Sequence, residues 1–166
     1  MREVDLEAWH EFFVATAGAA AALAGLVIVA ISVNVERILK YPQLPPRAAA
    51  TVAALVLVLT VSVAGLADQS TLAFGLEVLG LGAGAWYLQA RATLAGLRAD
   101  RENRRPRSEA VVEVLTGQVQ LLPFLVAGAL LVAGLPAAVY LLLAGFLAVL
   151  VLSMANAWVL LVEILR

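Results

Sequence analysis

Hydrophobic and polar residues along this chain fall into long blocks rather than into the short repeats of an amphipathic helix or strand. Two apolar runs, 12–33 and 48–67, contain no charged residue, and a third run, 72–94, contains only Glu77 and Arg91. A helix of roughly 20 apolar residues crosses the hydrocarbon of a bilayer. Each of these runs therefore predicts one transmembrane helix.

A further apolar stretch extends from Val111 to Leu165 and is too long for a single span. As one helix it would reach roughly 80 Å, far beyond the thickness of a bilayer. Glycine and proline interrupt helices, so we expect the chain to turn at Gly134-Leu135-Pro136. The predicted spans are 12–33, 48–67, 72–94, 111–134 and 137–164.

The expected fold is therefore all-α, an integral membrane bundle of five transmembrane helices in one domain, 1–166. An Arg-rich loop is expected at 95–110, and the third helix is expected to continue into it before breaking near Arg105-Pro106. Composition supports a membrane protein. Hydrophobic residues make up 63% of the chain, charged residues only 14%, and the mean hydropathy is +0.98. A soluble domain has about a quarter of its residues charged.

The distribution of Lys and Arg predicts the orientation of the spans. All but one of the 11 basic residues fall on one side of a five-span chain, which places that side in the cytoplasm and the N-terminus outside. The exception is Arg2, which shares its segment with four acids, an arrangement unlike the positive start of a cleaved signal peptide. Lys40 is the only lysine, and this Arg, Ala and Gly usage is typical of GC-rich bacterial genomes, so we expect a multi-pass protein of a bacterial inner membrane.

The predicted cytoplasmic loop has two interpretations. Its arginines either fix topology or contact anionic lipid head groups. They are Arg98, Arg101, Arg104, Arg105 and Arg107. Acids interrupt this cluster, and it lies against the membrane, so no nucleic-acid partner is expected.

Small residues form a stripe on the first predicted helix and a dense run on the third. The stripe consists of Ala15, Gly18, Ala22, Gly25 and Ser32, and the third helix carries Gly80 and Gly84 as a GxxxG pair. Such residues allow helix backbones to approach closely in lipid. Two interpretations stay open: packing within one chain, or contact between copies in a homo-oligomer or with a partner membrane protein.

Three polar residues are candidates for an intramembrane ion site: Glu77, Gln120 and Asn156. Glu77 lies about one and a half turns inside its span, where a carboxylate needs neutral donors, water, a cation or a proton. It shares a helix face with Gly84 and Arg91, which we expect to point inward or at a partner. The alternatives are that Glu77 reaches the interface or caps a neighbouring helix, and that Pro123 beside Gln120 is a plain kink.

A second polar cluster is expected where helix ends meet the inner leaflet. It would gather Asn34, Glu36, Asn156 and Glu163, with Arg91 as the counter-charge. The alternative is a set of separate interfacial caps and local pairs.

Enzyme chemistry has no support in the sequence. The chain has no cysteine and a single histidine, His10, and it contains no nucleophile elbow, P-loop or zinc-binding helix motif. We expect no catalytic residues, no cofactor and no metal. The sequence favours a non-catalytic, self-associating structural, regulatory or accessory membrane module, with membrane lipid and further copies or another membrane protein as partners. The alternative is a small oligomeric ion channel or transporter that uses the intramembrane polar residues.

Overall fold

The computed structural model describes residues 5–41, 44–103 and 114–162, with side chains placed up to 98 in the second range and up to 158 in the third. Every regular element in this part of the chain is helical. Five helices are long and apolar enough to cross a membrane, at Glu7–Val33, Leu44–Ala64, Thr71–Arg98, Val114–Val132 and Ala137–Trp158. The prediction of a multi-pass, all-helical membrane protein with five candidate spans is confirmed.

The first span combines the short 3-10 helix η1 (Glu7–Trp9) with α1 (His10–Val33). It ends at Asn34, where both the backbone N–H and the side-chain amide donate to the carbonyl of Ala30, each at 3.2 Å. Asparagine ends helices because its side chain competes for backbone hydrogen bonds. A short helix, α2 (Val35–Lys40), follows and leads toward the second span.

The second span is α3 (Leu44–Ala64), and two prolines lie in its first turn, where a missing N–H is tolerated. The third is α4 (Thr71–Asn103), whose 33 residues extend about 50 Å and so exceed the hydrocarbon thickness. Residues 95–103 of the predicted loop are therefore helical, as the expected continuation of this helix requires. Residues 104–110 lie outside the described part of the chain.

The fourth span is helical from Val114, turns at Gln120-Leu121, and continues as α6 (Leu122–Val132) with Pro123 in its first turn. It stops at Gly134, which has a φ of 69°. The N–H of Leu135 donates to the carbonyl of Leu130, and the N–H of Gly134 donates to that of Leu131. This is the Schellman pattern, which favours glycine at the left-handed position. The break predicted at Gly134 is confirmed, and α7 (Ala137–Val162) forms the fifth span.

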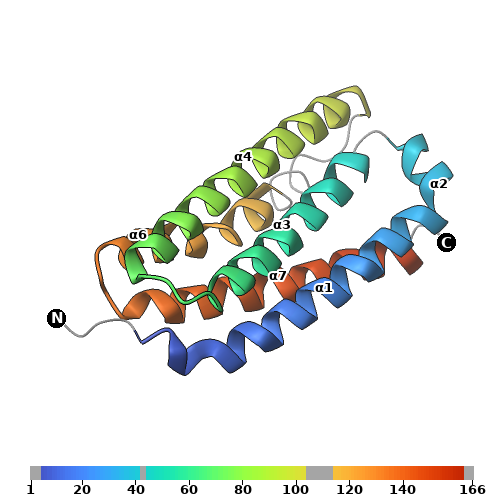
Figure 1. Cartoon of the computed structure of the whole chain (residues 1–166). Helices are drawn as coiled ribbons and strands as arrows, with labels where there is room; N and C mark the ends of the chain where they lie inside the picture. Colours follow the sequence, from blue (N-terminus) through green and yellow to red (C-terminus); the bar gives the residue numbers. More distant parts are fainter. Residues whose placement is uncertain (1–4, 42–43, 104–113, 163–166) are drawn as a thin grey trace.

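The five spans pack as a ring in which neighbours in space are α1–α3, α3–α4, α4–α6, α6–α7 and α7–α1. Figure 1 shows α3 in the middle of the bundle, where it also contacts α7 across the ring. Half of the most apolar window of α3 is buried, against 22% for the first span. The first span therefore presents the largest share of its surface to whatever surrounds the bundle.

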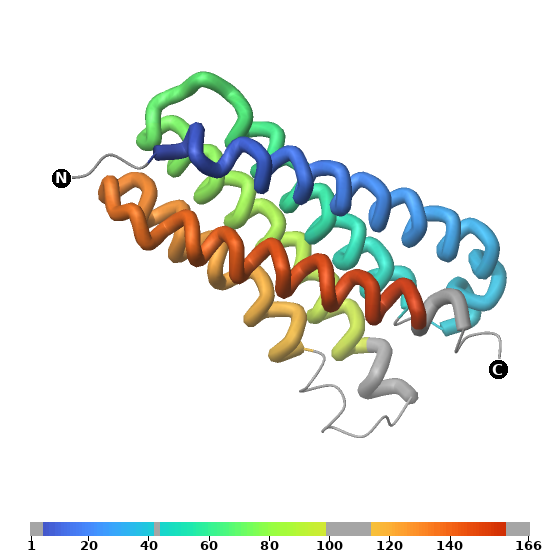
Figure 2. The backbone as a smooth tube through the Cα atoms, turned by 90° about the horizontal axis from the view of Figure 1, so that it is seen from below, coloured from blue at the N-terminus to red at the C-terminus, as the bar shows by residue number. Residues whose placement is uncertain are grey.

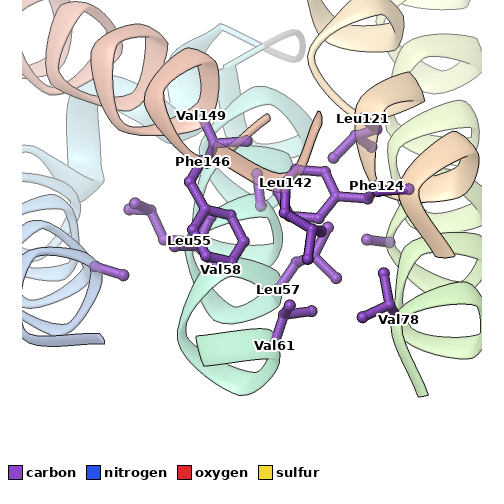
Figure 3. Close-up of a cluster of buried hydrophobic side chains, with 14 of the residues drawn as sticks. Leu55, Leu57, Val58, Val61, Val78, Leu121, Phe124, Leu142, Phe146 and Val149 are labelled. Carbon is purple, nitrogen blue, oxygen red and sulfur yellow. The ribbon is translucent and has the colours of Figure 1, made fainter. Parts of the chain in front are cut away.

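The interior of the ring is filled with branched and aromatic side chains. Four fully buried side chains lie where α3 meets α7: Leu55, Val58, Leu142 and Phe146 (Figure 3). The phenyl ring of Phe124 lies 5.4 Å from that of Phe146, measured between ring centres. A core packed in this way leaves side chains few alternative positions.

The two ends of the bundle differ in chemistry. One end, called the Trp9 end, holds η1 and the turns 65–70 and 133–136, and aromatic rings meet there. The ring of Trp9 lies 5.4 Å from that of Tyr140 and 5.7 Å from that of Phe12. The other end, called the Arg47 end, holds α2 and the first turn of α3.

Candidate functional site: hydrogen-bonded polar residues within the bundle

A ring of three hydrogen bonds joins α3 to α7 at the Arg47 end. Arg47 Nη2 donates to Asn156 Oδ1 at 3.0 Å, and Asn156 Nδ2 donates to Thr51 Oγ1 at 3.1 Å. The Thr51 hydroxyl in turn donates to the backbone carbonyl of Arg47 at 3.0 Å. We call these residues, Arg47, Thr51 and Asn156, the Arg47 network.

The chemistry of the groups fixes every direction in the Arg47 network. A guanidinium only donates, so the carbonyl oxygen of the Asn156 amide must face Arg47. The amide nitrogen must then face Thr51, whose own hydrogen goes to the backbone. Thr51 is 5% exposed, and Arg47 and Asn156 are half-buried. The network ties two helices that are far apart in sequence.

The sequence pointed to Asn156 but missed its partners. In the sequence, Arg47 contributes only to the balance of Lys and Arg that predicts orientation, and Thr51 carries no prediction. A signal was present, since Arg47 and Thr51 are four residues apart and so share one face of a helix that carries two prolines in its first turn. Ser153, 2% exposed, lies one turn before Asn156 on α7.

A second polar pair lies near the Trp9 end, between α1 and α3. The hydroxyl oxygens of Thr16 and Ser62 are 2.8 Å apart, and the residues are 6% and 0% exposed. Thr16 Oγ1 also lies 2.9 Å from the backbone carbonyl of Phe12. Either hydroxyl can donate in this pair, and when Thr16 gives its one hydrogen to the backbone carbonyl it accepts the hydrogen of Ser62.

Glu77 lies on the outward side of α4. Its carboxylate is exposed and accepts a hydrogen bond from Gln69 Nε2 at 2.9 Å, while the same amide donates to the carbonyl of Ala64 at 2.8 Å. Gln69 thus connects the last carbonyl groups of α3 to the second turn of α4, and we call this contact the Gln69 bridge. The expected ion site of Glu77, Gln120 and Asn156 is not assembled, because Asn156 belongs to the Arg47 network at the opposite end.

The outward position of Glu77 also corrects the expectation that its helix face points inward. Gly84 and Arg91, which share that face, are exposed as well, and the Arg91 guanidinium lies 5.9 Å from the centre of the Tyr87 ring. Contact of this face with a partner stays a prediction.

Gln120 is buried, with 8% exposed, at the turn between the two helical parts of the fourth span. In the preceding turn, the side-chain oxygen of Gln118 is buried and has no hydrogen-bond partner among the described residues. On α4, the amide of Gln89 lies against Gly117 so closely that a methyl group there would overlap it. The side-chain amide of Gln89 therefore lies in the contact between α4 and the fourth span.

Only some members of the expected inner-leaflet cluster belong to the residues that the structure describes. Asn34 is buried and bonds to its own helix, whereas Glu36 on α2 and Arg91 on α4 are exposed. Glu163 lies outside the described residues. Among the loop arginines, Arg98 is exposed on α4 and the backbone of Arg101 is helical, while Arg104, Arg105 and Arg107 lie outside the described part.

The small-residue stripe of α1 faces away from the bundle, so the interpretation that it packs within one chain is wrong. Every member of the stripe is exposed, and a Cβ built at Gly18 or Gly25 would meet nothing within 4 Å. The GxxxG residues Gly80 and Gly84 are open in the same way. The residues that α1 buries are Phe13, Thr16, Ala20, Val27 and Ala30.

Other glycines provide the close approaches between helices. A Cβ at Gly75 would lie 2.8 Å from the backbone nitrogen of Val132, and one at Gly128 would lie 2.9 Å from that of Leu79. Both positions bring α4 against α6. Ala22 on the α1 stripe is exposed and has no such role within the chain.

The described residues contain no group of three or more His, Cys, Asp or Glu side chains placed to hold a metal ion. Comparison of the chain with known protein families, curated proteins and solved structures found no match.

Proposed function

We propose that this chain is a non-catalytic structural or accessory module of a bacterial inner membrane that associates with further copies of itself. The observation that carries the proposal is the pairing of interior polar groups with one another. The Arg47 network and the Thr16–Ser62 pair use their polar atoms to join helices, and the space between them is filled by fully buried Phe, Leu and Val side chains. Paired polar groups in a packed interior suit a scaffold better than a water-filled path.

The outward small-residue faces support self-association. The α1 stripe and the Gly80–Gly84 pair leave open space beside the helix backbone. A second helix that fills this space gains close van der Waals packing, which is the main source of helix association in lipid. The proposed orientation, with the N-terminus outside, is supported by the Lys and Arg side chains that the structure describes, which lie toward the Arg47 end: Arg37, Lys40, Arg47, Arg91 and Arg98. Reporter fusions at residues 1 and 166 should give signals from opposite sides of the membrane.

Disulfide crosslinking tests self-association directly, because the chain contains no cysteine. Ala22→Cys, on the stripe, should form a covalent dimer in membranes under mild oxidation. Val151→Cys is the matched control, because Val151 is 66% exposed on α7 and lies outside the stripe. Gly18→Leu should reduce crosslinking through Ala22→Cys while leaving the fold of the single chain intact. Equal crosslinking at both cysteine positions, or at neither, would contradict the proposal.

A small oligomeric channel or transporter is the second candidate, and one observation favours it. The buried side-chain oxygen of Gln118 has no donor among the residues that the structure describes, which is the condition in which a bound water or ion is expected. Ion flux into vesicles that contain the purified chain distinguishes the candidates. The module predicts the background rate of empty vesicles, and the channel predicts a flux that Gln118→Leu changes.

A further inference from the structure

The short helix α2 buries one of its six side chains, that of Ile38. Ile38 is 3% exposed, while the other five residues of Val35–Lys40 are exposed. In Figure 1, α2 lies beyond the last turn of α1 and before the first turn of α3. It is therefore a surface element at the Arg47 end, on a part of the chain that the self-association proposal does not use.

The exposed side chains of α2 are of two kinds. Val35 and Leu39 are four residues apart and share one side of the helix, and they are 43% and 68% exposed. Tyr41, which follows directly, is 53% exposed. Glu36 and Lys40 share the next side. A helix surface that divides apolar from charged residues in this way is typical of segments that lie in a membrane interface.

The length of α1 sets the level of α2 in the membrane. The 24 residues of α1 extend about 36 Å, which already exceeds the roughly 30 Å of hydrocarbon. The residues that follow α1 thus lie at the level of the head groups. At this level Leu39 and Tyr41 have an apolar phase within reach, whereas full immersion in water would leave them without one.

The charge at this end is predominantly basic. Arg37 and Lys40 lie in the last turn of α2, and Arg47, Arg91 and Arg98 belong to the same end of the bundle. Glu36 is the single acid of α2. Anionic head groups attract basic side chains placed within a Debye length of the surface. The complementary partner of this surface is an anionic phospholipid leaflet.

We propose that α2 is an interfacial lipid-binding element. Val35, Leu39 and Tyr41 enter the boundary between head groups and acyl chains, and Arg37 and Lys40 contact the phosphates of anionic phospholipids. The proposal is independent of self-association, because the α1 stripe and α2 share no residue. It assigns α2 a lipid partner beyond the general attraction of the Arg-rich loop.

Depth measurement tests the apolar half of the proposal. Spin labels at Leu39→Cys and, as matched control, Glu36→Cys are compared in bilayers of phosphatidylcholine and phosphatidylglycerol. The label at position 39 should collide more with oxygen than with a water-soluble nickel chelate, and the label at position 36 should show the reverse preference. A label at position 39 that is as accessible to nickel as the one at position 36 would overturn the proposal.

Lipid-dependent melting tests the charged half. The purified chain in neutral detergent should melt at a higher temperature with added phosphatidylglycerol than with phosphatidylcholine. Arg37→Gln/Lys40→Gln should lose this difference, and Lys40→Gln alone should lose part of it. Arg91→Gln/Arg98→Gln removes the same charge from α4 and should retain it. Loss of the difference in both double variants would mean general charge attraction, and its absence from the unaltered chain would equally reject the α2 site.

Discussion

Adding one methyl group at Gly128 provides a direct test of the α4–α6 contact. In Gly128→Ala, the new carbon would lie 2.9 Å from the backbone nitrogen of Leu79 and 2.7 Å from its Cγ atom. Non-bonded carbon contacts are most favourable at about 3.5–4.0 Å. The side chain of Leu79 can rotate away, but its backbone moves only if the two helices separate.

The magnitude follows from two opposing effects. Overpacking of a well-packed contact typically destabilises by about 1–3 kcal/mol. Replacing glycine by alanine within a helix returns up to about 1 kcal/mol through the backbone entropy of the unfolded state. With the full gain of about 1 kcal/mol the net range is about 0–2 kcal/mol, and we expect Gly128→Ala to lower the free energy of unfolding by about 1 kcal/mol.

Gly80→Ala is the matched control, since it makes the same chemical change in a helix with nothing within 4 Å of the new carbon. It should leave stability unchanged or raise it by up to about 1 kcal/mol. The free energy of unfolding is measured in mixed micelles by titration with a denaturing detergent, with far-UV circular dichroism as the signal. The measurement is made at low protein concentration, so that association between copies through the outward face at Gly80 does not contribute to the measured stability. Equal effects at the two positions would refute the assigned contact between α4 and α6.

Three further changes test the other contacts. Asn156→Ala leaves donors and acceptors of the Arg47 network without partners and should destabilise by about 1–3 kcal/mol in the same titration, whereas Met154→Ala on the exposed side of α7 should have little effect. Gly134→Ala forces a side chain into the left-handed conformation and should lower the melting temperature, by a destabilisation of about 1–2 kcal/mol. A double-mutant cycle of Thr16→Val and Ser62→Ala should give a coupling energy near 0.6 kcal/mol, typical of helix–helix hydrogen bonds in membranes, and a coupling of zero would contradict the 2.8 Å contact.

Features set by local physics could be predicted from the sequence. In hydrocarbon, backbone groups must find their partners within the same segment, so a long apolar run becomes a helix whatever surrounds it. The turn at Gly134 was predictable for a similar reason, because the left-handed conformation it requires favours glycine at that position. Neither feature depends on which helices are neighbours.

The inward face of each helix could not be read from the sequence. In water, a helix buries its apolar side, but α1 is apolar on nearly all sides after Glu11. Its small-residue stripe was a reasonable candidate for close packing, yet the structure turns Phe13, Thr16 and Ala20 inward instead. The inward side of α1 mixes large residues, Phe13 and Val27, with small ones, Ala20 and Ala30, so residue size alone does not identify it.

The pairing of polar residues was limited in the same way. The sequence indicates how deep a polar side chain lies in the membrane, but not toward which helix it points. The position of Asn156 near the end of its span placed it at the Arg47 end, but its depth matched several residues, including Asn34 and Glu36. The contact between α3 and α7 across the ring selects Arg47 and Thr51 from the residues at this level. A sequence fixes how far each polar group lies along its helix, and only the order of helices around the bundle decides which groups meet. The position of Glu77 on the outward side of α4 is another consequence of that order, so its contacts beyond the Gln69 bridge depend on what surrounds the bundle.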